Sequence, residues 1–98
     1  MSHGSWMVYM IECADGTYYT GATNDLAKRL RAHNENEGAK YTKGRGPVEV
    51  KWVHRNLIRG DALSLEYRIK QLTKEQKKQL IEGEMSASDL HSIFQRNV

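Results

Sequence analysis

Residues 6–22 read WMVYMIECADGTYYTGA, and this stretch decides the fold. From Trp6 to Cys13 the chain presents apolar residues on both faces of an extended segment, which is typical of a central strand covered on both sides. The run Ala14-Asp15-Gly16 is a turn signal, and residues 17–22 read as a second strand. We therefore predict that the chain begins with a β-hairpin.

The length of the hairpin turn decides whether Tyr9 and Tyr19 share a face. A two-residue loop places them on opposite faces. A three-residue loop, with Gly16 in the left-handed conformation, pairs Ile11 with Tyr19 and Tyr9 with Gly21. Both phenols then lie on one face as diagonal neighbours, with their Cβ atoms roughly 7–8 Å apart. We expect this second arrangement, because the gap suits a phosphate or a water held between two hydroxyls.

The segment after the hairpin is predicted to be a helix, capped by Thr23 or Asn24 and ending near Asn34. The helical period aligns four positions on its core-facing side, namely Leu26, Arg29, Leu30 and His33. Two members of this stripe are polar, although a purely structural helix would turn them to solvent. Polar residues at core-facing positions, which break the local pattern in this way, are expected at functional sites. We therefore expect Arg29 to reach the two phenols and His33 to belong to the same candidate site.

The rest of the chain is predicted to hold one more strand and further helices. Residues 35–47 form a polar loop, and residues 48–54 alternate as a half-buried strand. Asp61 is predicted to cap a helix in which Glu66 lies at the edge of the apolar stripe. A capping-box pattern at Thr73 begins another helix, and the chain is expected to close with a short helix over residues 86–96.

Length and composition limit the protein to one domain of ordinary globular type. At 98 residues, 39% of them hydrophobic, the chain has room for one core. Its longest apolar run is far shorter than a bilayer span and no secretory pattern is recognisable, so we expect a cytoplasmic protein without a membrane partner. The single cysteine, Cys13, excludes an internal disulfide and suits a reducing compartment. No disulfide-linked partner is expected.

The positive charge is concentrated in the middle of the chain. The net charge is +3, but residues 26–59 hold nine basic residues against three acidic ones. A local excess of this size predicts a surface that faces a polyanion such as nucleic acid, although proteins that bind no nucleic acid also carry such excesses. The excess includes three cations of the polar loop, Lys40, Lys43 and Arg45.

The spacing of the polar residues resembles that of the GIY-YIG nuclease superfamily, in particular its small stand-alone bacterial members. The residues that carry the resemblance are Tyr9, Tyr19, Gly21, Arg29, His33 and, on a later helix, Glu66. The resemblance implies an α/β fold with a small three-stranded antiparallel sheet flanked by helices. The chain departs from the family pattern because its first motif keeps only the tyrosine, and Thr20 replaces the isoleucine of the second.

The resemblance also implies a metal-dependent endonuclease that hydrolyses phosphodiester bonds in DNA. In such an enzyme Glu66 binds one divalent ion, Mg²⁺ or Mn²⁺, and leaves positions for water and phosphate. Tyr9 activates the attacking water with help from His33, while Tyr19 and Arg29 contact the scissile phosphate. The DNA backbone outside the reaction centre is contacted by the loop cations, Lys40, Lys43 and Arg45.

Simpler interpretations of the same residues stay open. Tyrosines are favoured in strands for packing alone, and Glu66 can form an ordinary ion pair. Two alternative functions follow: a catalytically weak nucleic-acid-binding module, and a protein-interaction domain for an acidic partner. In all three cases we expect residues 1–5 to be an expression remnant or a disordered N-terminus, residues 6–83 to form the nuclease-like domain, and residues 84–98 to be a tail with a short helix.

Overall fold

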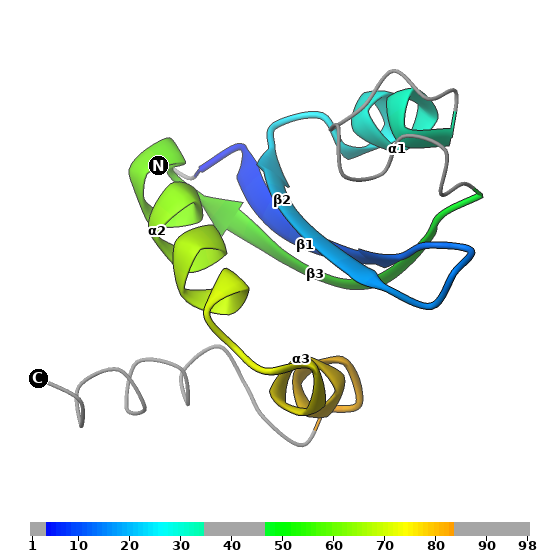
Figure 1. Ribbon diagram of the computed structural model, residues 1–98. Coiled ribbons are helices and arrows are strands. Elements are labelled where there is room, and N and C mark those ends of the chain that lie inside the picture. Colours follow the sequence, from blue (N-terminus) through cyan, green and yellow to red (C-terminus); the bar gives the residue numbers. More distant parts are fainter. Residues whose placement is uncertain (1–3, 35–46, 84–98) are drawn as a thin grey trace, which may run out of the picture.

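The computed structural model describes residues 4–34 and 47–83, and Figure 1 shows their arrangement. The elements in chain order are β1 (Trp6–Glu12), β2 (Tyr18–Thr23), α1 (Leu26–Asn34), β3 (Glu49–Leu57), α2 (Arg59–Lys70) and α3 (Lys74–Ile81). Within these ranges no helix is long and apolar enough to cross a bilayer. The helix predicted over residues 86–96 lies outside the described residues.

The strands form one antiparallel sheet in the order β2-β1-β3, so β1 is central as its apolar pattern predicts. The predicted hairpin register is confirmed: Tyr9 pairs with Gly21, and Ile11 pairs with Tyr19. The turn holds three residues, since the amide of Cys13 donates to the carbonyl of Thr17 over 2.8 Å. Gly16 has a φ of 86°, in the left-handed region that a glycine adopts without strain.

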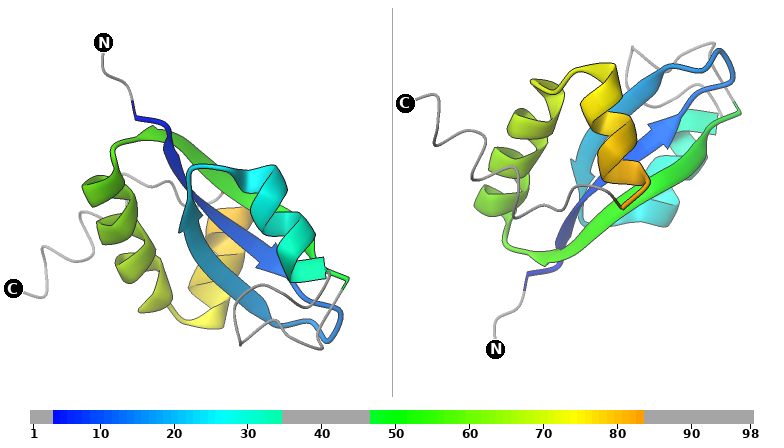
Figure 2. Two further views of the ribbon diagram at one scale, coloured as in Figure 1. Left: turned by 90° about the horizontal axis from the view of Figure 1, so that it is seen from above. Right: turned by 90° about the horizontal axis from the view of Figure 1, so that it is seen from below.

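The two faces of the sheet have different coverings. Figure 2 shows α1 on one face and α3 on the other. α2 lies at the end of the sheet where β1 begins and β2 ends, and it packs against both strands (Figure 1). The buried apolar core joins the sheet to α2 and α3, and its members are Val8, Met10, Ala62, Ile69, Leu72 and Leu80. The odd-numbered positions of β1, among them Tyr9, therefore face α1.

The helix ends differ in part from the expectations. α1 begins at Leu26, and its first turn is capped by Asp25, whose Oδ1 accepts from the amide of Lys28 over 3.1 Å. Thr23 instead accepts from the amide of Asp25 over 3.0 Å and stabilises the turn before the helix. α2 begins at Arg59, so the prediction of an Asp61 cap is wrong. The capping box at Thr73 is confirmed at the start of α3.

Candidate active site

Gly21 allows the ring of Tyr9 to lie directly against the backbone of β2. A Cβ atom added at Gly21 would stand 2.6 Å from Cζ of Tyr9, closer than real Cβ contacts come. Because these two residues are register partners, the ring crosses from β1 to the neighbouring strand over the glycine. The glycine two positions after Tyr19 is therefore a packing requirement of the first phenol.

Tyr9, Tyr19 and His33 form one group of rings on the α1 side of the sheet, which we call the tyrosine–histidine cluster. The hydroxyl of Tyr9 lies 3.0 Å from Nε2 of His33. The ring centroids of Tyr9 and Tyr19 are 6.4 Å apart, and those of Tyr19 and His33 are 5.2 Å apart. Tyr9 and His33 are fully buried, whereas Tyr19 is half-buried. Tyr19 is thus the member of the cluster that reaches the surface.

Burial sets the protonation of the buried pair. Burial raises the pKa of Tyr9 above its ordinary value of 10.0, and the hydrogen-bonding guanidinium of Arg29 opposes that rise. Burial also lowers the pKa of His33 below 6.5, and the charge of Arg29 lowers it further. Both groups are therefore neutral near pH 7. A neutral phenol and a neutral imidazole share one hydrogen bond, and the tautomer of His33 decides whether the Tyr9 hydroxyl or Nε2 is its donor.

Arg29 faces both phenols from the first half of α1. Its pKa is raised chiefly by hydrogen bonding to Tyr9, with smaller contributions from Tyr19. The residue is half-buried, so the guanidinium is held against the cluster and still touches solvent. The structure thus brings together four of the residues selected from the sequence, Tyr9, Tyr19, Arg29 and His33.

Glu66 approaches the cluster from α2. Its side chain is only 18% exposed, and its Oε2 pairs with Nζ of Lys70, one turn later, over 3.0 Å. The negative charge of Glu66 is near enough to add a small rise to the pKa of Tyr9. The ordinary ion pair anticipated for this carboxylate is therefore present, and it sits beside the tyrosine–histidine cluster.

The described residues contain no group of three or more histidine, cysteine, aspartate or glutamate side chains that could surround a metal ion. Mg²⁺ does not require such a group, since it commonly takes one or two carboxylates and completes its shell with water and phosphate oxygens. A single, mostly buried carboxylate such as Glu66 matches that donor set. The residues present therefore fit a divalent ion that is held jointly with a phosphate.

Some residues of interest lie elsewhere or were missed. Lys40, Lys43 and Arg45 lie outside the described residues. Lys70 was not selected from the sequence, although its position four residues after Glu66 is the standard spacing of a helical ion pair. Cys13 is buried with a free thiol, as a small core residue.

The fold agrees with comparisons to known proteins. Residues 5–79 match the GIY-YIG catalytic domain, and the chain belongs to that family. Within it, the chain is 51% identical over 73 residues to a UPF0213 protein of Halobacterium salinarum, covering 74% of this chain and 95% of the relative. It is 42% identical over 90 residues to a UPF0213 protein of Cronobacter sakazakii, covering 92% and 95%.

A solved structure supports the same placement. The solution NMR structure of the UPF0213 protein BH0048 from Bacillus halodurans is 39% identical in sequence, with a TM-score of 0.51. The match covers 84% of each chain. The predicted α/β fold with a three-stranded antiparallel sheet is thereby confirmed, and so is the resemblance to small single-domain members of this nuclease family.

Proposed function

We propose that this protein is a metal-dependent endonuclease that hydrolyses phosphodiester bonds in DNA. The observation that carries the proposal is the convergence of two phenols, an imidazole and a guanidinium from β1, β2 and α1 on one place that the charge of Glu66 also reaches. Packing alone does not require an arginine and a buried histidine at such a place. Phosphoryl chemistry does require positive charge and hydrogen-bond donors around the phosphate.

Exposure divides the roles in this proposal. Tyr19 and Arg29 are half-buried and so contact the scissile phosphate, where Arg29 offsets the charge that grows on its oxygens. Tyr9 and His33 are buried and act on protons. Because burial raises the pKa of Tyr9, its phenol takes a proton from the attacking water only if it passes its own proton to Nε2 of His33.

Glu66 is proposed to hold a divalent ion, Mg²⁺ or Mn²⁺, which supplies positive charge to the phosphate oxygens when it is bound. With such an ion bound, the carboxylate would no longer pair with Lys70, and the ammonium would be available for another anion. Lys40, Lys43 and Arg45 are proposed to contact the DNA backbone away from the reaction centre.

Nicking of supercoiled plasmid tests the proposal directly. The wild type is expected to nick DNA with Mg²⁺ or Mn²⁺ and to stop when EDTA is added. Glu66→Gln keeps the shape of the side chain but removes its charge, so it should abolish nicking and leave the fold intact. Glu75→Gln, at an exposed position of α3, is the matched control and should nick like the wild type.

The same assay separates the alternatives. DNA binding without nicking, in the wild type and with either metal, would favour a binding module that has lost turnover. The absence of both binding and nicking would favour a protein-interaction domain. Equal nicking by wild type and Glu66→Gln would remove Glu66 from the metal site.

A further inference from the structure

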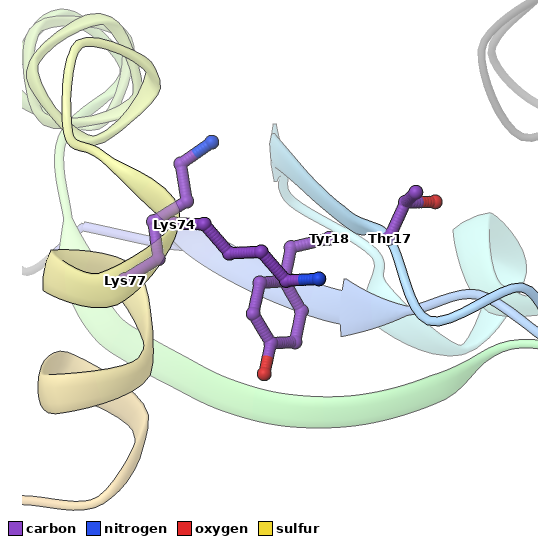
Figure 3. A pocket seen from close by; sticks show the side chains of 4 residues that line it. All are labelled: Thr17, Tyr18, Lys74 and Lys77. Atoms are coloured by element: carbon purple, nitrogen blue, oxygen red, sulfur yellow. The ribbon is translucent and has the colours of Figure 1, made fainter.

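A groove runs along the outer edge of β2, between that strand and the helices α2 and α3. It consists of two adjoining cavities of about 170 and 340 Å³ that share Tyr18 and Lys77. The first cavity is also lined by Thr17 and Lys74, as Figure 3 shows. The second is completed by Tyr19, Thr20 and Lys70. We call the two together the β2-edge groove.

The charged residues of the groove are all lysines. Lys74 reaches from α3 to the ring of Tyr18, with its Nζ 5.8 Å from the ring centroid (Figure 3). Burial lowers the pKa of Lys77, and the neighbouring positive charge of Lys70 lowers it further. Among the described residues neither Lys74 nor Lys77 forms an ion pair. The groove therefore holds positive charge that the described part of the chain does not neutralise.

Thr20 provides an independent sign of a ligand. It is 3% exposed, it lines the groove, and its hydroxyl has no hydrogen-bond partner within residues 4–34 and 47–83. Buried hydroxyls are normally paired, because leaving one unpaired is costly. A hydroxyl can donate to an anion, and lysines at the same groove bind anions as point charges.

We propose that the β2-edge groove binds the phosphate backbone of the nucleic acid strand where it extends away from the scissile phosphate. Tyr19 lies between the two places, since its ring belongs to the tyrosine–histidine cluster on the α1 side of the sheet and the residue also lines the groove at the strand edge. Lys70 connects them again, because it lines the groove and pairs with Glu66. The proposal rests on the proposed nuclease function, which it extends by assigning a path to the substrate strand.

Lysines beside an edge strand have another known use, which is to prevent edge-to-edge pairing with other sheets. That use calls for exposed lysines and gives no role to a buried, unpartnered hydroxyl. Lys70 and Lys74 are exposed and suit that use, but it does not explain Lys77, which is half-buried and lines the groove together with Thr20. An anionic ligand explains both residues.

Binding of fluorescein-labelled oligonucleotides, measured by anisotropy in EDTA over a range of salt, tests the groove without any cleavage. Lys77→Ala should lower the slope of log K against log[salt] by about 0.7 for a single strand or 0.9 for a duplex, the value for one phosphate contact. Thr20→Val should weaken binding about ten-fold at fixed salt and keep the slope, since it removes a hydrogen bond to a charged group. Lys78→Ala is the matched control, because Lys78 is exposed on α3 and lines neither cavity.

The outcomes distinguish this proposal from the nuclease function. If the wild type nicks plasmid and Lys77→Ala has the same slope of log K against log[salt] as the wild type, the groove proposal is overturned and the nuclease function is unaffected. A second outcome is a wild type that binds DNA but never nicks it, while Lys77→Ala shows a smaller slope of log K against log[salt]. That result would support the groove and count against the nuclease function. Backbone NMR shifts at Thr20 and Lys77 that inorganic phosphate reproduces at equal phosphate concentration would assign the site to a small anion and overturn the strand path. Shifts with oligo-glutamate but not with oligonucleotide would also overturn it.

Discussion

Replacing Tyr9 by phenylalanine removes one oxygen atom from the centre of the tyrosine–histidine cluster. The hydroxyl lies 3.0 Å from Nε2 of His33, and both side chains are fully buried. The buried Nε2 of His33 then loses this partner and keeps its desolvation penalty. A buried hydrogen bond removed from one side in this way costs about 1–3 kcal/mol. We expect the free energy of unfolding of Tyr9→Phe to fall by about 2 kcal/mol.

Urea unfolding followed by tryptophan fluorescence measures this change. The urea concentration at the midpoint should fall while the m-value stays the same, because the surface exposed on unfolding is unaltered. Tyr67→Phe is the matched control: Tyr67 is 66% exposed, so its loss should change the free energy of unfolding by less than about 0.5 kcal/mol. Thermal unfolding should agree, since about 1 kcal/mol corresponds to roughly 4–8 °C in a domain of this size.

The same variant tests the chemistry. Nicking should fall about 10²-fold or more if Tyr9 accepts the proton of the attacking water, and DNA binding should change little because Tyr9 is buried. Unchanged stability would mean that the phenol and His33 are not bonded as described. Destabilisation with full nicking would mean that Tyr9 is a structural strand aromatic, and proton transfer would then need another group.

Three further predictions follow from individual contacts. Gly21→Ala should lower the free energy of unfolding by about 1–3 kcal/mol, since the new Cβ would meet the ring of Tyr9. Gly60→Ala, which has open space at its Cβ, should not destabilise α2, and urea unfolding of both variants checks this. The depressed pKa of His33 means that the unfolded chain binds its proton more readily, so stability is lost as pH falls below about 6.5; the slope of unfolding free energy against pH between 5 and 7 should decrease in His33→Gln. Thr20→Val should raise the free energy of unfolding by about 1 kcal/mol, as differential scanning calorimetry without DNA would record.

Local sequence rules were sufficient to predict the hairpin but left two registers open. The three-residue turn was preferred because it brings both phenols to one face, and the structure confirms its pairing of Tyr9 with Gly21. The polar positions of the α1 stripe then place Arg29 beside the phenols. The start of α2 was not predictable in this way, because burial of Ala62 and Ile69 determines that helix and no side chain caps it at Ile58.

The β2-edge groove escaped prediction for a different reason. It joins β2 to lysines more than 45 residues later in the chain, on two helices separated by a break, and tertiary packing alone brings them together. In the sequence each lysine is indistinguishable from an ordinary solvated cation. Thr20 likewise reads as a favourable strand residue, and only the structure reveals that its hydroxyl is buried without a partner among the described residues.

The buried polar residues of the described chain connect the two proposals. They are Thr20, Thr23 and His33. Thr23 hydrogen-bonds within the turn before α1, which is a structural use, and His33 contacts Tyr9 in the candidate active site. Two of the three buried polar residues are thus paired internally. The third, Thr20, is costly to leave unpaired, and a ligand would explain why it is kept. Because Thr20 lines the groove together with Lys77, a phosphate oxygen suits this role, and the stability expected in Thr20→Val should come with weaker nucleic acid binding.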